Sequence, residues 1–468
     1  MKIPTGIPGL DDVLKGGLEK GWSYLIKGEP GTGKTIFGLQ FLLAGEKSVY
    51  ISFDEVYEEV KLQAERFGWS LDNIHFVDKV KEIDILKGDI FFFDYDTIPN
   101  ITEFIESITK LKELENVERV FIDGIGILRD ITKDSSIYRR ILSSIIKFLN
   151  SVGATTIISA EMTDDVGKDV ISYLMSGEFV LRRRKRRDGK VFRTIEVLKY
   201  RSGDVYLGEH YFNITPRGIV IYPIIPVYKP KEYERKLIST GNTELDKMLG
   251  GGILKGSKVY IAGKTGVGKT SLCLQILKAN DEKGNVGILY AFNESKDKIL
   301  RKYKEVFDYE PKKLVVREVE NISLGEFYNM VIEDIKLKPE IIAIDPLNAV
   351  DEMAISTDEF LSMLSLLKNQ LEGLGITFIG IYEITQPVSE FHFTGAGMSR
   401  FADYLIVGRH MEMEGELLKT IAVIKNEFGN HERMIRILDI ESGKGLKIGE
   451  PLKEYSGIIS GVIRRATS

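Results

Sequence analysis

Two short stretches of the sequence decide the fold: Gly28–Thr35 reads GEPGTGKT, and Gly263–Thr270 reads GKTGVGKT. Each matches GxxxxGK followed by Ser or Thr, a pattern that is specific when it follows a strand and opens a helix. There its glycines let backbone N–H groups cradle phosphates at the helix N-terminus. Both copies lie between a short apolar run and a longer amphipathic one. The sequence therefore predicts two phosphate-binding loops in one chain.

The two loops belong to a longer internal repeat. Its matching pairs are TG and LD within 5–11 and 240–246, FIDG at 121–124 with AIDP at 343–346, and VLKYR at 197–201 with VIKNE at 423–427. Between the copies, residues 222–233 read YPIIPVYKPKEY. Prolines at this density disfavour helix and central strand and are typical of an extended linker. We expect a first domain at residues 1–225, a linker at 226–237 and a second domain at 238–468.

Short apolar runs alternate with longer amphipathic segments in each half. In the first half we expect buried parallel strands and crossover helices. The strands are Tyr24–Lys27, Ser48–Phe53, Val120–Asp123 and Thr155–Ala160, and the helices are Gly33–Ala44 and Ser135–Val152. This alternation predicts two tandem α/β domains, each a mostly parallel sheet flanked by helices.

The composition narrows the function classes. A formal net charge of -5 argues against a protein that coats nucleic acid over its whole surface. The single cysteine, Cys273, follows the second loop on an expected apolar helix face, so we expect a buried, inert thiol. No apolar stretch reaches the roughly 20 residues of a membrane helix, and residues 1–6 lack a signal pattern. We expect a soluble, cytoplasmic protein without membrane contact.

Both loops predict a site for ATP and Mg²⁺. Lys34 and Lys269 would reach the β and γ phosphates, and the Thr35 and Thr270 hydroxyls would hold Mg²⁺. Asp123 and Asp345, which end apolar runs, would supply the second Mg²⁺-side group. The nucleotide-binding residues that we expect are Gly28, Gly31, Thr32, Gly33, Lys34 and Thr35 in the first loop, and Gly263, Gly266, Val267, Gly268, Lys269 and Thr270 in the second.

Hydrolysis also needs a group that positions and deprotonates water. Asp54 and Glu55 follow the second expected strand directly, and the matching residues of the second half are Asn293 and Glu294. An amide cannot act as a general base, so we favour catalysis in the first half only. The alternative is that Asp54 and Asn293 are N-caps of the helices that follow, a role that suits both residue types.

Two cations complete the pattern in the first half. Lys199 and Arg201 lie two residues apart on an expected strand, so their side chains share a face. A subunit boundary next to an ATP site could receive both from the neighbouring subunit as a trans-acting finger. The second half has Lys425 and Glu427 at the matching positions. The alternative is that Lys199 and Arg201 are simply solvated strand residues.

Over nearly its whole length the chain resembles the RecA-superfamily ATPases of the KaiC family. The resemblance is carried by TGIPGLDDVLKGGL, GEPGTGKT, SFDE, FIDG and LKYR in the first half, and by TGNTELDKMLGGG, GKTGVGKT, IAIDPL and GIISG in the second. It implies a hexamer of two stacked rings with Mg-ATP bound between subunits. It also implies that the paired acids and the Lys and Arg of the next subunit assist hydrolysis. These roles carry over to Asp54, Glu55, Lys199 and Arg201, and Glu294 is the matching acid of the second half.

The departures from the family pattern fall mainly in the second half. The family's strand-end pair is typically two glutamates, so Asp54 is one methylene short and Glu55 is expected to carry more of the work. In the second half, Asn293 and Glu427 remove the first acid and the arginine finger. We expect the first domain to hydrolyse ATP, and the second to bind ATP mainly for assembly and regulation.

The clock protein of this family has an adjacent phosphorylatable Ser-Thr pair, which corresponds to Ser399 and Arg400 here. A two-site phosphorylation cycle is therefore not expected. Weak autokinase activity toward Ser399 or Thr394 stays an alternative that we do not favour. The sequence also ends at Ser468, soon after GIISG, without the long tail of the clock protein. A clock role is therefore not implied.

Two alternative functions stay open at this stage. Arg182–Arg187 reads RRRKRR, which could grip phosphodiesters, and RecA and RadA relatives are DNA-dependent ATPases. No aromatic residues for base stacking interleave with this run, so nucleic-acid binding is not favoured. A scaffold that assembles on ATP without hydrolysing it is the other alternative. We expect a homo-oligomer and a regulatory protein partner whose identity the sequence does not give.

Overall fold

The computed structural model describes residues 1–78, 106, 108–110, 114–132, 135–162, 170–187, 189–384, 401–413, 415–453, 455–456 and 464–465. The chain forms two compact units. The first contains Met1–Lys185 and Gly189–Ile225, and the second contains Arg186–Asp188 and Pro226–Ser468.

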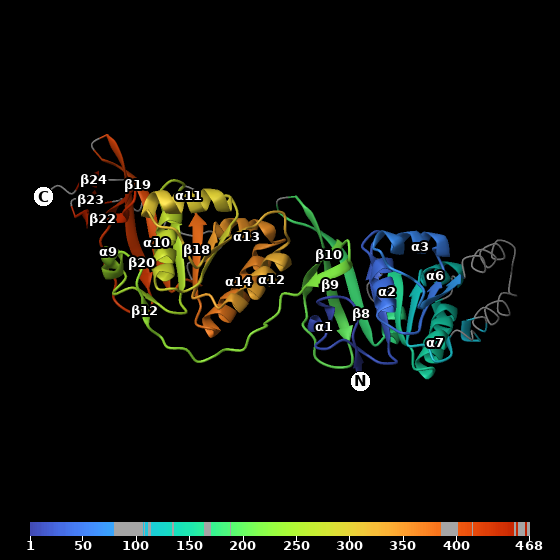
Figure 1. Ribbon diagram of the computed structural model, residues 1–468. Coiled ribbons are helices and arrows are strands. Elements are labelled where there is room, and N and C mark those ends of the chain that lie inside the picture. The colour runs from blue at the N-terminus through green and yellow to red at the C-terminus, as the bar shows by residue number, and fades with distance from the viewer. Residues whose placement is uncertain are drawn as a thin grey trace. The chain divides into compact units, whose positions relative to one another are not determined.

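The first unit is built on a nine-stranded sheet in the order β11-β10-β9-β8-β3-β7-β6-β4-β5. Its strands β8, β9 and β10 are labelled in Figure 1. The strands are β3 Ser23–Gly28, β4 Ser48–Ser52, β5 Ile74–Asp78, β6 Arg119–Asp123, β7 Thr155–Glu161, β8 Gly177–Lys185, β9 Val191–Tyr200, β10 Glu209–Thr215 and β11 Gly218–Tyr222, with a small pair β1 Lys2–Ile3 and β2 Leu18–Glu19. The six strands from β8 to β5 are parallel, and β9, β10 and β11 continue the sheet as antiparallel strands.

Helices cover both faces of this sheet. The described helices are α1 Leu10–Val13, α2 Lys34–Leu43, α3 Tyr57–Arg66, α6 Ile127–Thr132, α7 Ser135–Ser151 and α8 Val170–Leu174. Neighbouring residues of β3 belong to different cores: Tyr24 and Ile26 lie in the same cluster as the α2 side chains, whereas Leu25 lies with those of α7. Both faces are apolar, as a buried parallel sheet requires, and this explains the continuous apolar runs in the sequence.

The second unit repeats this architecture in the same strand order, β16-β15-β17-β18-β14-β19-β20-β21-β22. Its strands are β12 Leu237–Ile238, β13 Ile253–Leu254, β14 Lys258–Gly263, β15 Gly287–Ala291, β16 Leu314–Glu318, β17 Ile341–Asp345, β18 Thr377–Glu383, β19 Tyr404–Met413, β20 Glu416–Asn426, β21 Arg436–Glu441, β22 Gly445–Pro451, β23 Tyr455–Ser456 and β24 Arg464–Arg465. Its helices are α9 Thr243–Met248, α10 Lys269–Glu282, α11 Lys296–Phe307, α12 Leu324–Asp334, the 3₁₀ turn η2 Ile335–Leu337, α13 Leu347–Met353 and α14 Thr357–Gly373. The predicted fold class, two tandem α/β domains with mostly parallel sheets flanked by helices, is confirmed.

The proline-rich segment after β11 lies against the second unit. The backbone N–H groups of Val227 and Tyr228 donate to Oε1 of Gln370 on α14, at 2.9 and 2.6 Å. The N–H of Lys231 donates to the carbonyl of Gly373 at 2.7 Å. These contacts satisfy backbone donors that an extended, proline-rich segment cannot pair within itself.

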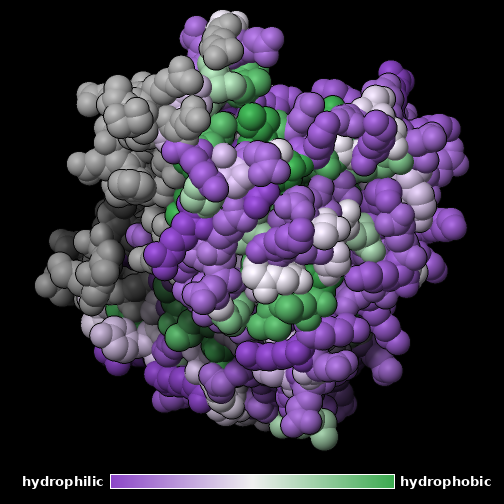
Figure 2. Space-filling model, turned by 90° about the vertical axis from the view of Figure 1, so that its left-hand side faces the viewer, coloured by the Kyte–Doolittle hydropathy of each residue, from purple (hydrophilic) through white to green (hydrophobic). Residues whose placement is uncertain are grey.

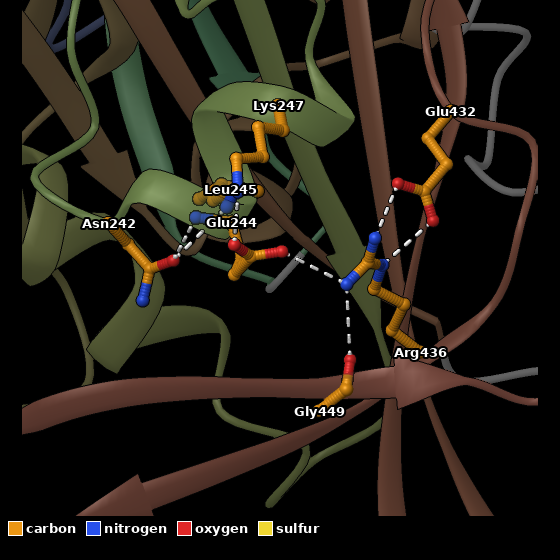
Figure 3. A network of polar contacts seen from close by, with 7 residues as sticks. All are labelled: Asn242, Glu244, Leu245, Lys247, Glu432, Arg436 and Gly449. Carbon is orange, nitrogen blue, oxygen red and sulfur yellow. Dashed lines mark hydrogen bonds and ion pairs between the residues drawn. The ribbon is translucent and has the colours of Figure 1, made fainter.

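A polar network ties the far edge of the second sheet to α9 (Figure 3). The Arg436 guanidinium on β21 forms two 2.7 Å hydrogen bonds with Glu432 and one of 3.1 Å with Glu244. Glu432 holds the pKa of Arg436 above its usual value. Asn242 caps α9 by accepting from the N–H groups of Glu244 and Leu245. The short helix is therefore fixed at both its N-cap and its first turn.

The surface around this edge is mostly hydrophilic, with smaller hydrophobic areas between the polar residues (Figure 2). Among the described residues, no helix is both long enough and apolar enough to cross a membrane.

The single cysteine is buried, as predicted, and burial raises the pKa of its thiol. Cys273 on α10 matches Gly38 on α2, and Ala343 on β17 matches Phe121 on β6. A Cβ added at Gly38 would lie 2.3 Å from the Phe121 ring. Each unit therefore combines one small and one larger residue at this helix–strand contact.

This complementarity predicts a non-additive pair of substitutions in the first unit. Gly38→Cys should destabilise by about 1–3 kcal/mol through overpacking, and Phe121→Ala by about 3–5 kcal/mol through a cavity. The double variant should lose at least about 1 kcal/mol less than the two singles together, because the cysteine fills part of the cavity. Urea unfolding followed by tryptophan fluorescence checks this, since both tryptophans, Trp22 and Trp69, lie in the first unit. Additive losses would contradict it.

Candidate nucleotide-binding sites

The first phosphate loop connects β3 to α2. Gly33 is the N-cap of α2 with a φ of 109°, a left-handed conformation that favours glycine. The Lys34 ammonium donates to the carbonyls of Gly28 at 2.8 Å and Glu29 at 3.2 Å. Burial lowers the pKa of Lys34, against the opposing influence of nearby carboxylates led by Asp123. The loop thus presents helix N–H groups and a lysine at one place, which is the chemistry of a phosphate site.

The second loop connects β14 to α10 in the same way. Gly268 is the N-cap with a φ of 102°, and the Lys269 ammonium donates to the carbonyl of Lys264 at 2.8 Å. Burial lowers the pKa of Lys269 as well. Val267 is buried, and a Cβ added at Gly408 on β19 would lie 2.9 Å from its side chain. Close packing of the loop on β19 explains why the chain has glycine at position 408.

A hydroxyl–carboxylate pair follows each loop. The Thr35 hydroxyl donates to Asp123 Oδ2 at 3.0 Å, and the Thr270 hydroxyl donates to Asp345 Oδ2 at 2.7 Å. Asp123 also accepts from the hydroxyls of Tyr50, at 2.7 Å, and Ser159. Burial raises the pKa of Asp345.

These oxygens fit Mg²⁺. A hard cation prefers hydroxyl, carboxylate, phosphate and water oxygens, and Mg²⁺ usually takes only one or two protein carboxylates beside substrate phosphates. No group of three or more His, Cys, Asp or Glu side chains forms a metal cluster among the described residues. The donor set therefore suits an Mg²⁺ that arrives with a nucleotide better than a cation caged by protein alone.

The strand-end acids lie beside these pairs. The N–H of Phe53 donates to the carbonyl of Asp123 at 3.0 Å, and the N–H of Phe292 donates to that of Asp345 at the same distance. The residues that follow, Asp54 in the first unit and Asn293 in the second, therefore occupy matching backbone positions next to Asp123 and Asp345.

Glu55 is half-buried among like charges. Gln63 Nε2 on α3 donates to Glu55 Oε2 at 3.0 Å. Burial, then Asp123 and Asp54, raise the pKa of Glu55 to about 7. A carboxylate with a pKa near the operating pH combines a large ionised fraction with a useful proton affinity, which suits a general base.

Glu294 has the opposite surroundings. Lys298 Nζ contacts Oε1 at 2.8 Å and Lys302 Nζ contacts Oε2 at 3.5 Å, both from α11. Burial acts to raise the pKa of Glu294, but the hydrogen bond from Lys298 and the charges of both lysines outweigh it and lower that pKa. The two matching glutamates therefore differ in proton affinity.

The helix-cap alternative for Asp54 and Asn293 is wrong. The N-cap of α3 is Val56, which has no side-chain cap, and the N-cap of α11 is Ser295, whose hydroxyl accepts from the N–H of Lys298. Each helix begins too late for the strand-end residue to reach its first turn.

The structure brings Lys199 and Arg201 to the same neighbouring element. Lys199 Nζ on β9 donates to the carbonyl of Ser172 at 2.5 Å, and the Arg201 guanidinium donates to that of Tyr173 at 3.3 Å. Both acceptors lie on α8. Neither cation is bonded to the phosphate loop of its own unit among the described contacts.

The matching positions in the second unit, Lys425 and Glu427, carry opposite charges. The N–H of Arg201 donates to the carbonyl of Ser176, and the N–H of Glu427 donates to that of Asp403, so the backbones correspond. Lys425 forms an ion pair with Glu427 at 2.6 Å. The remaining cation at this place is thus neutralised within its own unit.

Part of the basic run is neutralised too. Arg182 forms ion pairs with Glu196 and Glu209, and Arg184 with Glu209, all within the first sheet. Arg183 and Lys185 point to solvent. Thr394, Ser399, Arg400 and the GIISG segment at 457–461 lie outside the described residues.

Sequence reasoning missed three kinds of partner. Tyr50 and Ser159 reach Asp123 from other strands, which no local pattern signals. Gln63 lies eight residues after Glu55, and Lys302 lies eight after Glu294. Both glutamates precede their helices, so these pairings depend on where each helix begins.

Known proteins resemble this chain over nearly its whole length. A family model described as "ATPase: KaiC" matches residues 3–225 and 238–453. The circadian clock protein KaiC3 of Synechocystis is 30% identical, over 98% of this chain and 94% of the relative. The circadian clock oscillator protein KaiC of Synechococcus elongatus is 30% identical, over 100% of this chain and 92% of the relative.

The raised pKa of Glu55 predicts a pH-dependent stability. A folded-state pKa near 7, above the ordinary 4.5, means that folding favours the protonated acid, and this stabilisation is lost as pH rises through 7. Glu55→Gln should therefore stabilise the first unit more at pH 8 than at pH 5. The difference should be of the order of 1 kcal/mol, because solvent screens a half-buried group.

Urea unfolding by tryptophan fluorescence, without ATP or Mg²⁺, measures this difference. Glu58→Gln, which removes an exposed charge three residues later, on α3, is the matched control. An equal effect of Glu55→Gln at both pH values would show that the acid is not perturbed.

Proposed function

Because the chain belongs to the KaiC family of ATPases, we propose that it works as a two-ring regulatory ATPase. Its first domain hydrolyses Mg-ATP, and its second domain binds ATP mainly for assembly and regulation. The observation that carries this division is the contrast between Glu55, whose pKa is raised to about 7, and Glu294, which two lysines hold in ion pairs.

The first domain holds a full set of groups for phosphoryl transfer to water. Lys34 binds the β and γ phosphates, and Thr35 and Asp123 hold Mg²⁺, which neutralises charge on the phosphate oxygens when bound. Glu55, assisted by Asp54, takes a proton from water as the water oxygen attacks the γ-phosphorus and the bond to the bridging oxygen breaks. ADP leaves with the electron pair of that bond.

The second domain keeps the binding groups and lacks much of the catalytic set. Lys269, Thr270 and Asp345 match their counterparts, so ATP and Mg²⁺ binding is supported. Asn293 cannot accept a proton, and Glu427 stands where the guanidinium of Arg201 stands in the first domain. A general base contributes about 10² to 10⁴ in rate, and an arginine finger about 10³ to 10⁵. Partial loss of both leaves the site nearly silent.

Assembly into a homo-hexamer with ATP between subunits completes the first site. Lys199 and Arg201 then reach the phosphates of the neighbouring subunit and stabilise charge in the transition state. Tyr173, whose carbonyl accepts from Arg201, and Leu198, which precedes Lys199, are 69% and 50% exposed, so both cations lie beside solvent-accessible surface. A regulatory protein partner reads the nucleotide state of the rings.

The alternatives fit less well. Arg182 and Arg184 are already paired with carboxylates, which weakens the case for a DNA-dependent ATPase. A non-hydrolysing scaffold would not need Glu55 at a pKa near 7. The relatives are named as circadian clock proteins, yet the Arg400 side chain cannot accept a phosphate as a hydroxyl does, so a two-site phosphorylation cycle is not part of the proposal.

The two phosphate-loop lysines test the division of labour. Lys34→Ala should remove at least about 90% of ATP turnover, because it disables the site with a complete catalytic set. Lys269→Ala should mainly weaken ATP-dependent assembly. Radiolabelled ATP turnover and light scattering on both variants measure the two properties. Equal loss of turnover in the two variants would contradict the proposed division of roles between the two domains.

Subunit mixing tests the trans assignment. Rings of Arg201→Ala alone, and rings of Asp54→Asn/Glu55→Gln alone, should both be nearly inactive. Mixed rings should regain part of the turnover, because some sites receive intact acids from one subunit and Arg201 from the next. Subunit exchange is verified first by labelling the two variants with different fluorophores. No recovery in exchanged rings would refute a finger supplied in trans.

A further inference from the structure

The helix after the strand-end acid differs between the units at the positions nearest that acid. Glu55 and Glu294 occupy matching places, because each lies two residues after a phenylalanine whose N–H donates to the carbonyl of Asp123 or Asp345 at 3.0 Å. Four and eight residues further on, the first unit has Glu59 and Gln63, and the second has Lys298 and Lys302. The substitution pattern thus replaces an acid and an amide by two cations.

In the first unit the acid keeps a free oxygen. Gln63 donates to Oε2 of Glu55, and Oε1 accepts no hydrogen bond from the described part of the chain. Among the described residues, the charges that raise the pKa of Glu55 are those of Asp123, Asp54 and Glu59, in that order, and all three are negative. A single neutral donor therefore orients this carboxylate while its surroundings keep its proton affinity high.

In the second unit both oxygens are engaged. Lys298 contacts Oε1 and Lys302 contacts Oε2, and the side chain of Glu294 is only 23% exposed. Asp345 is the negative group that faces it from β17. Two ammonium groups favour the charged form of the acid and hold it along α11, so it is both a weaker base and a less mobile one.

We infer that Gln63 is a positioning residue that keeps Glu55 available to take the proton of the attacking water, and that Lys298 and Lys302 withhold Glu294 from that role. This inference rests on the proposed function, because it explains which acid can act. Asn293→Glu and Glu427→Arg leave Glu294 in its ion pairs with Lys298 and Lys302. These two changes together should therefore reactivate the second site only weakly.

The competing explanation is structural, since ion pairs at this spacing also stabilise surface helices. Moving the two lysines from α11 to the matching positions of the first unit distinguishes the positioning role from the structural one, and we call this double variant the transplant. Glu59→Lys/Gln63→Lys in the full chain places the α11 cations on α3. Turnover is taken as the part that Lys34→Ala abolishes, so that only the first site is counted.

The transplant should lower kcat by about 10- to 100-fold, a part of the full value of a general base. KM for ATP should change by less than about twofold, because no nucleotide contact is removed. The acid limb of the kcat–pH profile should move to lower pH, since the cations favour ionised Glu55. A purely structural role would not lower kcat at an unchanged KM, and it would not shift the acid limb of the kcat–pH profile.

Glu58→Lys/Leu62→Lys is the matched control. It makes the same change in charge on the same helix, one residue earlier, at positions that are exposed. The control should keep turnover within about twofold of the unmodified protein. Equal kcat and equal pH profiles for transplant and control would overturn the inference. No Lys34-dependent turnover in the unmodified protein would instead remove the proposed function, and the inference with it.

The reverse transplant covers the case in which α3 does not tolerate the lysines. In a Lys34→Ala background with Asn293→Glu and Glu427→Arg, adding Lys298→Glu and Lys302→Gln should raise turnover at least about tenfold. Light scattering verifies that rings form. Intact rings with no gain would contradict the withholding role of the lysines.

Discussion

A hydrogen bond from a threonine hydroxyl to an aspartate carboxylate joins two sides of each candidate nucleotide site. It runs from Thr35 to Asp123 in the first domain and from Thr270 to Asp345 in the second. In each sheet the aspartate strand is separated from the strand before the loop by one other strand. The bond therefore ties the N-terminus of the phosphate-loop helix to the aspartate strand. The residues that precede Asp54 and Asn293 bond to the backbone of the same aspartate.

The constraint is shared, but the charges built around it are not. In the first domain, Glu55 meets a neutral amide and several carboxylates, whereas Glu294 meets two ammonium groups. Similarly, Arg201 is exposed in the first domain, whereas its counterpart Glu427 forms an ion pair with Lys425. The two units therefore share the hydroxyl–carboxylate pair of the candidate site, and they differ in the charges around the matching glutamates and at positions 201 and 427.

Much of the fold could be predicted because its signals are local. A continuous apolar run such as Ser48–Ser52 marks a strand buried on both faces, and the loop glycines mark where a strand gives way to a helix. Partners that come from distant strands, such as Tyr50 and Ser159 on Asp123, carry no such signal. The sequence also does not mark the exact start of α3 and α11, since Asp and Asn suit an N-cap as well as Ser295 does.

Site-resolved labelling tests the central claim, that the two domains treat the same nucleotide differently. The chain is incubated with Mg²⁺ and 8-azido-ATP labelled at either the α or the γ phosphate, cross-linked by light over time, and cleaved between the domains. The account predicts that both domains retain the α label, while the first domain loses the γ label and the second keeps it. Loss of the γ label at the same rate from both domains would contradict it.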